Sequence, residues 1–432
     1  MNEEKKYLLI LFLISFVFFF ARIWEPYLSG DALKHALTAK ETIFTKDWLN
    51  LSLCHEPYLK KPPFYFWLIT ISYKIFGISA FSARLFPALF GIFNAFLLYI
   101  IGKEIFKEKI YALIAALFFV INWHVLRLTT IVRMESIITF FIFLNFYLLM
   151  KGKKYFILSG IPLGLGILTK GPLAFLGILS FLIFCLLKRD FRFVCWQFLF
   201  GLFIAVFISS PWYIYQWVEN KAFFTEFLGN QIGARITGTL SEGDERNYIF
   251  YFYRLSTNFW PGLLFFIIGI YFFFKKKVFI ESDWWKALFV YIIFVFIIIN
   301  VPKEKFTRYL YYLYPSFALF CALSLRELNI GKIFVKIIYL LVFPYILVII
   351  FYPHPFHKDK FKNCHNACKI IKNMDANIKT EGLSELENCY FYFYCVKDLN
   401  KKPSVLISKK ERKKSIYSQD GIFLYKINNS AE

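Results

Sequence analysis

The sequence lacks the motifs that mark several common enzyme classes. It contains no Gly-rich phosphate loop, no His-Glu-x-x-His metal pattern and no Gly-x-Ser-x-Gly nucleophile motif. It also shows no tandem repeat. The missing phosphate loop argues against a transporter driven by ATP hydrolysis, whereas a secondary transporter is compatible with the same absence.

Acidic residues are scarce in this chain. It has 29 Asp and Glu against 51 Lys and Arg, which gives a formal net charge of +22. In a soluble protein such an excess would suggest a nucleic-acid partner. Here the lysines cluster in short segments between apolar runs, where they set the orientation of a membrane protein. The positive charge is therefore explained by topology and does not predict nucleic-acid binding.

Apolar and aromatic residues dominate what is present. The 432 residues are 58% hydrophobic and 22% aromatic, with 57 Phe and a mean hydropathy of +0.53. Soluble domains are only about 45–50% apolar, so the composition predicts a polytopic membrane protein. We expect the first apolar run to be retained as a span, because no small-residue cleavage site follows it.

The apolar runs predict an all-α transmembrane bundle. A span needs roughly 17–25 largely apolar residues, and runs near this length indicate about 11–13 spans, some of them short. We expect residues 1–352 to form the transmembrane domain and residues 353–432 a small extracytoplasmic α+β domain. The predicted spans lie near residues 7–24, 80–101, 109–123, 135–150, 155–169, 172–187, 194–212, 249–274, 286–300, 308–325 and 333–351.

Lysine and arginine clusters alternate with long polar loops along the chain. Clusters such as Lys5-Lys6 and Lys275-Lys276-Lys277 all fall on one side of the predicted spans. By the positive-inside rule that side is cytoplasmic. An odd number of spans then places the N-terminus inside and the C-terminus outside, which predicts a multi-pass protein of the cytoplasmic (inner) membrane.

The same alternation decides one ambiguous segment in the first outer loop, residues 25–79. Phe64 to Phe76 is apolar enough to be a span. If it crossed the membrane, every later lysine cluster would be moved to the outside. We therefore expect an interfacial helix that begins after the Pro62-Pro63 break.

The tail combines short helical and strand patterns with cysteines. Residues 363–373 predict a helix, and residues 390–394, 404–407 and 422–425 predict strands. Four cysteines favour disulfides if the tail is exported, and a zinc site that includes His365 is the weaker alternative. These cysteines are Cys364, Cys368, Cys389 and Cys395.

Asp31 follows the first predicted span and opens an amphipathic stretch that should lie on the membrane surface. Lys34, His35 and Thr38 share its helical face. Ser29 could cap this helix, and the helix dipole would favour the ionised carboxylate. Taken alone, a catalytic acid and an acid that only stabilises a helix start are about equally plausible.

Several cations lie on the outer side, against the sorting rule for positive charge. Each could be a surface or structural residue, but together with two outer carboxylates they suit a membrane-level site for a lipid phosphate. Glu135, at the outer start of a span, is the second carboxylate, and Arg133 is a possible partner for it in a purely structural ion pair. The candidate phosphate-binding cations are Lys60, Lys61, Arg84, Lys170, Arg235 and Arg308, with Lys305 beside the last.

The order of these motifs resembles the polyprenyl-phosphate-dependent membrane glycosyltransferases of the C-type superfold. The resemblance covers roughly residues 25–320 and is closest to the lipid A aminoarabinose transferases and protein O-mannosyltransferases. Its most specific part is the Glu-Pro-Tyr to Lys-Pro-Pro block. The segments that carry it are Gly30-Asp31, Glu56 to Pro63, Ala83-Arg84-Leu85, Arg133-Met134-Glu135, Thr169-Lys170-Gly171-Pro172, Ser210 to Tyr213, Gly233 to Gly238 and Tyr309 to Pro315.

The resemblance implies roles for these residues. Asp31 matches the catalytic aspartate that orients or deprotonates the acceptor, and Glu135 matches a second acid, which we expect to be catalytic as well. Lys61 matches the lysine that contacts the carrier phosphate, and Arg84 and Arg235 match nearby basic positions. Lys60 stands where the aminoarabinose branch has a metal-binding Glu, so the resemblance supports no certain metal cofactor.

The function implied is transfer of a sugar from a polyprenyl phosphate to an extracytoplasmic acceptor. A glycolipid such as lipid A is the first choice of acceptor, and protein Ser or Thr is the second. A secondary transporter or lipid flippase is the alternative of another class, although it would more often carry mid-span acids and paired broken helices.

Overall fold

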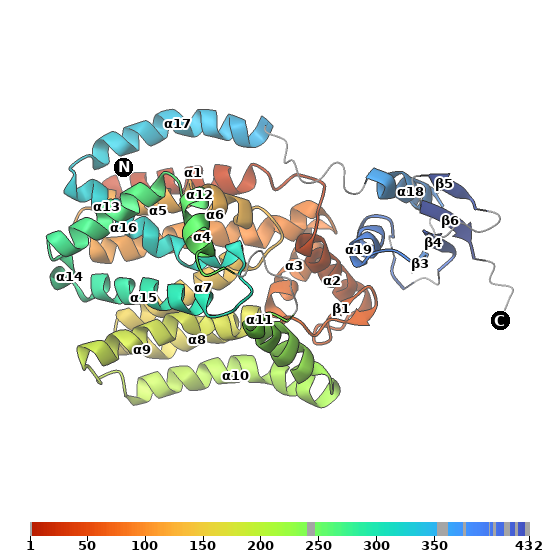
Figure 1. Ribbon diagram of the computed structural model, residues 1–432, viewed down its shortest axis with the longest axis horizontal. Helices are drawn as coiled ribbons and strands as arrows, with labels where there is room; N and C mark the ends of the chain where they lie inside the picture. The colour runs from red at the N-terminus through yellow and green to blue at the C-terminus, as the bar shows by residue number, and fades with distance from the viewer. Residues whose placement is uncertain are drawn as a thin grey trace. The chain divides into compact units, whose positions relative to one another are not determined.

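The computed structural model describes residues 2–239, 247–351, 362–374, 377–396, 398–400, 403–409, 415–419 and 422–427, and within these it is mostly helical (Figure 1). The chain forms two compact units. The first contains Met1–Ile23, Leu59–Tyr65 and Phe86–Phe351, and the second contains Trp24–Tyr58, Phe66–Leu85 and Tyr352–Glu432. The helical class predicted from the apolar runs is therefore confirmed.

The first unit is built of helices, two of which, α3 and α4, continue into the second. In chain order they are α1 (Glu3–Phe20), α3 (Phe64–Phe76), α4 (Ala80–Ile105), α5 (Lys109–Val120), α6 (Trp123–Thr129), α7 (Glu135–Met150), α8 (Lys153–Lys170), η1 (Gly171–Phe175), α9 (Leu176–Lys188), α10 (Trp196–Glu219), η2 (Thr225–Gly233), α11 (Ala234–Thr237), α12 (Phe250–Asn258), α13 (Gly262–Lys275), α14 (Val278–Glu281), α15 (Asp283–Asn300), η3 (Thr307–Tyr312), α16 (Tyr314–Glu327) and α17 (Gly331–Phe351).

Several of these helices are long and apolar enough to cross a membrane. Among the described residues five segments qualify, and two bent pairs, α5 with α6 and α12 with α13, raise the number to seven. This is fewer than the apolar runs predicted. The run at 7–24 lies in α1, whose 18 residues include four charged ones. The runs at 135–150 and 308–325 contain helices of only 16 and 14 residues, and the two runs between 155 and 187 count as one segment.

Glycines bring α8 and α10 into direct backbone contact. A Cβ atom on Gly160 would lie 2.0 Å from the carbonyl oxygen of Gly201, and one on Gly201 would lie 2.3 Å from that of Phe156. Small residues at such positions let membrane helices approach closely, where dispersion contacts replace the missing hydrophobic driving force. This packing fixes α8, the helix that ends at Lys170.

In the second unit, α2 (Asp31–Thr45) organises the first polar loop. Glu41 is 1% exposed, and its carboxylate accepts hydrogen bonds from Ser52 Oγ and from the backbone N–H of Cys54 and His55. These bonds hold a hairpin of β1 (Ser52–Leu53) and β2 (Glu56–Pro57). Cys54 and His55 both have positive φ, as a two-residue type I′ turn requires.

The predicted helix after the Pro62-Pro63 break is present as α3. Its second-unit residues pack on α2, since Thr70 Oγ1 and Tyr73 Oη donate to the carbonyl oxygens of Ala39 and Ala36. Trp67 Nε1 also donates to the carbonyl oxygen of Trp48. With 13 residues α3 is a short apolar helix, and its interfacial position stays a prediction.

The tail forms a small α+β fold, with α18 (Lys362–Asn373) and α19 (Glu385–Tyr394) beside a four-stranded sheet. The sheet order is β3-β4-β6-β5, in which β3 and β4 are parallel and the other neighbours antiparallel. The strands are β3 (Ile378–Glu381), β4 (Val405–Ser408), β5 (Tyr417–Gln419) and β6 (Ile422–Lys426). The predicted helix and the last two predicted strands are confirmed.

The predicted strand at residues 390–394 is wrong, because this aromatic run lies in helix α19. Ser384 and Glu387 form a capping box that starts the helix at Glu385, ahead of this run. The run is buried, so it shows no alternation of exposed and buried residues. A short, continuous apolar run cannot be assigned to helix or strand by periodicity alone.

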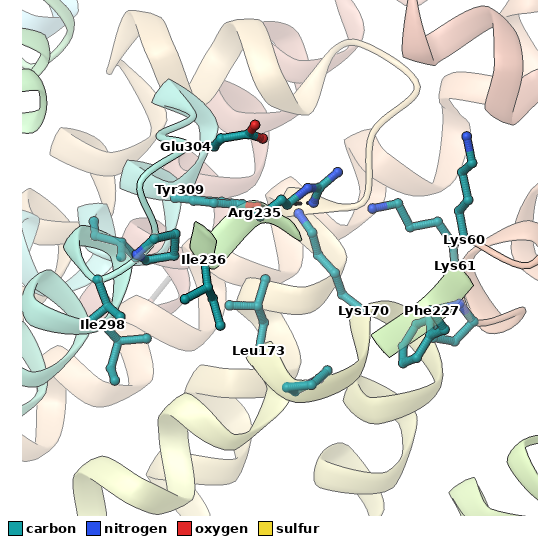
Figure 2. A pocket seen from close by; sticks show the side chains of 15 residues that line it. Lys60, Lys61, Lys170, Leu173, Phe227, Arg235, Ile236, Ile298, Glu304 and Tyr309 are labelled. Carbon is teal, nitrogen blue, oxygen red and sulfur yellow. Dashed lines mark hydrogen bonds between the residues drawn. The ribbon is translucent and has the colours of Figure 1, made fainter. Parts of the chain in front are cut away.

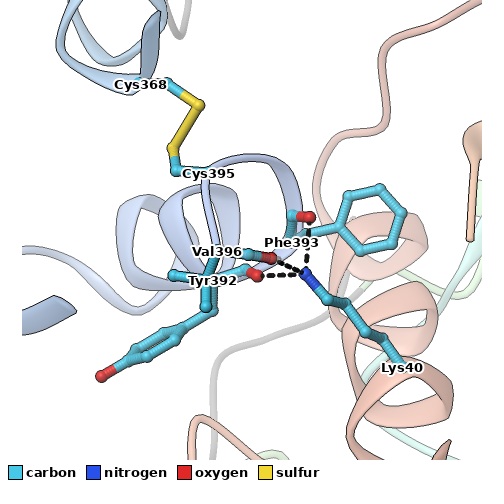
Figure 3. Close-up of a disulfide and its surroundings, with 6 residues drawn as sticks. All are labelled: Lys40, Cys368, Tyr392, Phe393, Cys395 and Val396. Atoms are coloured by element: carbon cyan, nitrogen blue, oxygen red, sulfur yellow. Dashed lines mark hydrogen bonds between the residues drawn. A yellow bond between two sulfur atoms is a disulfide. The ribbon is translucent and has the colours of Figure 1, made fainter. Parts of the chain in front are cut away.

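Lys40 of α2 anchors the end of α19 (Figure 3). Its Nζ donates to the carbonyl oxygens of Tyr392, Phe393 and Val396 at 2.8, 3.0 and 2.5 Å. Burial lowers the pKa of Lys40 to about 7, whereas the three carbonyl dipoles favour the protonated form. Lys34 adds an ion pair with Glu385 at 2.5 Å.

Candidate functional site

A cavity of about 330 Å³ in the first unit gathers four of the predicted phosphate-binding cations (Figure 2). Lys60 and Lys61 come from the segment before α3, Lys170 from the end of α8, and Arg235 from α11. Figure 2 shows the head groups of Lys61, Lys170 and Arg235 pointing toward one another, while Lys60 points away. The rest of the wall is mostly apolar, and Glu304 is its one acid among the described residues.

The end of α8 places Lys170 at this wall. The next residue, Gly171, has φ +63°, which ends the helix in a conformation that glycine adopts without strain. The Nζ of Lys170 donates to Glu135 Oε1 at 2.8 Å and to Tyr312 Oη at 2.9 Å. It also lies 5.6 Å from the ring centroids of Tyr309 and Tyr312.

Glu135 is the first residue of α7, and its side chain is 2% exposed. Its close partner is Lys170, and Arg308 Nε lies 3.7 Å from the same oxygen. Lys170 and Arg308 are therefore partners of Glu135 that the sequence did not predict, and a pairing with Arg133 stays a prediction. A buried carboxylate is tolerated when it is paired in this way. The arrangement makes Glu135 a residue that orients Lys170.

A run of tyrosines in η3 and α16 fixes the wall behind these charges. Tyr311 Oη bonds to Thr129 Oγ1 at 2.7 Å, and Tyr314 Oη bonds to His124 Nδ1 at 2.8 Å. Tyr291 Oη donates to the carbonyl oxygen of Tyr312 at 2.9 Å. Because buried hydroxyls with partners rigidify the segment, Tyr312 presents a fixed oxygen to Lys170. The run from Tyr309 to Pro315 belongs to the family resemblance, but its residue pattern alone predicts no role for these hydroxyls.

Arg235 lies where two segments distant in the chain pair through their backbones. Its carbonyl oxygen accepts a hydrogen bond from the N–H of Glu304 at 3.3 Å, and Ile236 accepts one from Lys303 at the same distance. The guanidinium carbon lies 5.1 Å from the ring centroid of Phe306, within cation–π range. This pairing brings Glu304 to the cavity.

Glu304 is a residue that sequence reasoning missed. It is 1% exposed, and neither carboxylate oxygen has a hydrogen-bond partner among the residues that the structure describes. The available signal is an acid between two lysines, Lys303 and Lys305, in a loop between two apolar runs.

Asp31 and Arg84 belong to the second unit. Asp31 is the partly exposed first residue of α2, and the N-cap is Gly30 with φ +54° and no side-chain cap. The expected cap by Ser29 is therefore corrected. The guanidinium of Arg84 donates to the carbonyl oxygens of Glu25 and Tyr27, the latter at 2.6 Å, and so fixes the segment after α1. Their predicted catalytic and phosphate-binding roles stay predictions.

Two cysteines of the tail are joined by a disulfide within the described ranges. Cys368 and Cys395 form a disulfide between α18 and the residue after α19 (Figure 3). Cys364 and Cys389 are free and buried. Within the described part of the chain, no three His, Cys, Asp or Glu side chains come together as metal ligands.

The cavity suits an anionic head group. Four cations line it, and the nearby carboxylate of Glu135 is already satisfied in part by Lys170. Lysine and arginine beside an oxyanion form charge-assisted hydrogen bonds, which are about twice as strong as neutral ones. The apolar remainder of the wall, including Leu173, Phe227 and Ile298, suits a hydrophobic attachment to that head group.

Comparisons with known proteins agree with this chemistry. The family described as dolichyl-phosphate-mannose-protein mannosyltransferase matches residues 60–215. An uncharacterized protein of Aquifex aeolicus (strain VF5) is 28% identical over 343 residues, which are 76% of this chain and 66% of the relative. The undecaprenyl phosphate-alpha-4-amino-4-deoxy-L-arabinose arabinosyl transferase of Wigglesworthia glossinidia brevipalpis is 34% identical over 163 residues, 36% of this chain and 28% of the relative.

A solved structure shares the fold. The crystal structure of ArnT from Cupriavidus metallidurans bound to undecaprenyl phosphate aligns with a TM-score of 0.64 at 16% identity, covering 90% of this chain and 74% of that one. At this identity the likeness shows a common fold. This chain spans less than two thirds of the length of the two relatives above.

Proposed function

Because the chain has the C-type fold of the polyprenyl-phosphate-dependent membrane glycosyltransferases, we propose that it transfers a sugar from a polyprenyl phosphate to an extracytoplasmic acceptor. The observation that carries the proposal is the cavity lined by Lys60, Lys61, Lys170 and Arg235. A polyprenyl phosphate is a leaving group already activated, so a transferase of this kind needs no nucleotide-binding fold.

In the proposed reaction an acceptor oxygen attacks the anomeric carbon of the sugar. The bond from that carbon to the phosphate oxygen breaks, and polyprenyl phosphate leaves with the bonding electron pair. Lys61, Lys170 and Arg235 stabilise the negative charge that develops on the leaving phosphate. Glu135 acts through Lys170, which it holds at the wall by their 2.8 Å contact.

By the family resemblance, Asp31 is the residue that acts on the acceptor. As the first residue of α2, its carboxylate is favoured in the ionised form by the helix dipole. An ionised carboxylate can accept the proton of an acceptor hydroxyl as a general base. We propose Asp31 in this role on the strength of the sequence motif.

A glycolipid such as lipid A is the acceptor we favour, because the sequence resembles the lipid A branch of the family. Two relatives are named as undecaprenyl phosphate-alpha-4-amino-4-deoxy-L-arabinose arabinosyl transferases, which is in keeping with that branch. Transfer to protein Ser or Thr is the second candidate, supported by the mannosyltransferase family that matches residues 60–215. For either acceptor we propose a location in the cytoplasmic membrane with the C-terminal domain outside. The Cys368–Cys395 disulfide supports this orientation, since disulfides persist in oxidising compartments.

The test is single-turnover transfer in liposomes from a polyprenyl phosphate that carries a radiolabelled sugar. Membrane lipid extracts and envelope proteins serve as two separate acceptor pools. We expect Lys61→Ala to lower the transfer rate about 100-fold or more, because it removes a donor to the leaving phosphate. Asp31→Asn should lower it about 100-fold or more as well, because general-base catalysis contributes about that factor.

The matched control is Lys153→Ala, which removes an exposed lysine at the start of α8, the helix that ends at Lys170. It should transfer sugar like the wild type. Label in the lipid pool identifies a glycolipid acceptor, and label in the protein pool identifies the second candidate. Wild-type rates in both the Lys61 and the Asp31 variants would refute the mechanism.

A further inference from the structure

Glu304 occupies an unusual position for a carboxylate. It lines a cavity with four cations, yet neither of its oxygens has a hydrogen-bond partner in the described ranges. Figure 2 shows it on the opposite side of the cavity from Lys60 and Lys61. Buried carboxylates are almost always paired, because removing the charge from water is costly. A group supplied from outside the chain is the natural partner.

The backbone around Glu304 is held in place. Its N–H donates to the carbonyl oxygen of Arg235. The next residue, Lys305, is fully buried and donates from Nζ to the carbonyl oxygens of Asn300 and Pro302, both at 2.8 Å. The position of the carboxylate is therefore built into the fold and does not depend on a loose loop.

Charge decides which part of a ligand can meet Glu304. A phosphate would be repelled by a carboxylate and attracted by the cations at the other side of the cavity. The group that meets Glu304 must donate hydrogen bonds, as hydroxyl and ammonium groups do. On a polyprenyl-phosphate sugar such groups occur only on the sugar ring.

We propose that Glu304 binds the sugar of the donor, with its two oxygens accepting hydrogen bonds from hydroxyl or ammonium substituents of the ring. This assignment rests on the proposed function. It makes Glu304 a specificity-determining residue, separate from the cations that hold the phosphate. A site built to hydrogen-bond a substrate discriminates strongly against a ligand that lacks the bonding group.

The experiment measures binding, so that it does not depend on turnover. The probes are undecaprenyl phosphate without sugar, the same lipid carrying arabinose, and the same lipid carrying 4-amino-4-deoxyarabinose. Each is titrated against detergent-solubilised wild type, Glu304→Ala, Glu304→Gln and Glu219→Gln. Glu219 is an exposed acid at the end of α10 and serves as the matched control.

We expect Glu304→Ala to weaken binding of at least one sugar-bearing lipid about 10-fold or more. Binding of the sugar-free lipid should not weaken, because the variant removes a charge that repels its phosphate. A larger loss for the amino sugar than for arabinose in Glu304→Gln would identify an ammonium as the partner, and equal small losses would identify hydroxyls. Wild-type affinity for both sugar lipids in Glu304→Ala would overturn the assignment, and so would equal weakening of all three lipids. If the wild type binds none of the lipids, the proposed function itself fails.

A separate observation concerns two cysteines of the second unit. The Sγ atoms of Cys54 and Cys389 lie 3.7 Å apart, although 335 residues separate them in the chain. Cys54 lies in the turn of the β1–β2 hairpin, and Cys389 is fully buried in α19. Both backbones are anchored to α2, through Glu41 at the hairpin and Lys40 at the end of α19.

We propose that Cys54 and Cys389 form a second disulfide, which joins the first polar loop to the C-terminal domain. The partly exposed Cys54 attacks the disulfide of a thiol–disulfide oxidoreductase as a thiolate, and one sulfur of that enzyme leaves as a thiol. Cys389 then attacks the mixed disulfide at Cys54 Sγ. Both cysteines lose their protons, and the oxidoreductase disulfide is reduced to two thiols.

The test is peptide mapping by mass spectrometry of full-length protein trapped with N-ethylmaleimide and digested without reductant. We expect one linked pair containing Cys54 and Cys389 beside the pair containing Cys368 and Cys395. Cys54→Ser should release Cys389 to the label after denaturation, and Cys321→Ser, a buried thiol of α16, should leave the linked pair intact. Label on both Cys54 and Cys389, in protein whose Cys368–Cys395 bond is intact, would overturn the proposal.

Discussion

At the scale of single residues, the main feature is the pair of Glu135 and Lys170. Their side chains are 2% and 8% exposed, and they lie 35 positions apart in the chain. Such a pair offsets the desolvation of both charges, but removing one partner leaves the other buried and uncompensated. The pair therefore matters more for the placement of Lys170 than for net stability.

We predict that Glu135→Leu and Lys170→Met each lower the free energy of unfolding by about 3–5 kcal/mol. The double variant should recover most of that loss, because apolar side chains replace the pair, while sugar transfer stays abolished. Thermal unfolding in detergent and the transfer assay measure the two effects. Single variants as stable as the wild type would contradict the prediction.

The sequence identified the residues of the cation cavity better than it identified their partners. Lys60, Lys61, Lys170 and Arg235 were found because outer cations violate the charge-sorting rule. Lys170 was not predicted as a partner of Glu135, since sequence proximity pointed only to the neighbouring Arg133. Glu304 was missed because its burial depends on a backbone pairing with residue 235, which no local pattern reveals.

At the scale of secondary-structure elements, the contact of α8 with α10 sets the position of the site. Gly160 and Gly201 leave no room for a side chain between the two helices. Overpacking a tight contact forces backbone shifts that cost about 1–3 kcal/mol. A shift of α8 would be transmitted to Lys170 at its end.

We predict that Gly160→Ala lowers the melting temperature in detergent and also weakens binding of sugar-free undecaprenyl phosphate. Gly229→Ala is the control, because a Cβ there meets only one atom, at 4.0 Å. It should leave the melting temperature unchanged. Equal melting temperatures for Gly160→Ala and wild type would contradict the prediction, because they would mean that α8 and α10 can move apart without loss of stability.

Element prediction succeeded where length or flanking residues gave a clear signal. The helix at Phe64–Phe76 followed from its Pro62-Pro63 boundary and from charge alternation, and the tail strands β4 and β6 followed from short β-branched runs. The aromatic run of α19 was misassigned because tertiary burial removes periodicity. The π-helical turn η2 and the hairpin around Cys54 had no distinctive local signal.

At the scale of the whole molecule, orientation in the membrane is the property that the proposed function requires. Lysine clusters near residues 103–109, 151–154 and 275–277 predict a cytoplasmic side, and the disulfide-bonded tail predicts the opposite side. An acceptor outside the cytoplasm is accessible only in this orientation.

We predict that alkaline phosphatase fused after residue 432 is active, because that enzyme folds only when exported. The same enzyme inserted between Asp190 and Phe191, in the loop between α9 and α10, should be inactive. A cytoplasmic fluorescent-protein reporter at the same two points should give the reverse pattern. An active internal fusion would reverse the orientation.

The anchoring of Lys40 has a consequence for how this protein can change over time. Two of the three acceptors of Lys40 belong to α19 and the third to Val396, two residues beyond the helix end. All three are main-chain oxygens, which every amino acid provides. Replacement of the side chains at 392, 393 or 396 would keep these acceptors as long as the helix end keeps its course. The tail can therefore diverge widely in sequence while one lysine, whose length and charge no other residue reproduces, stays under constraint.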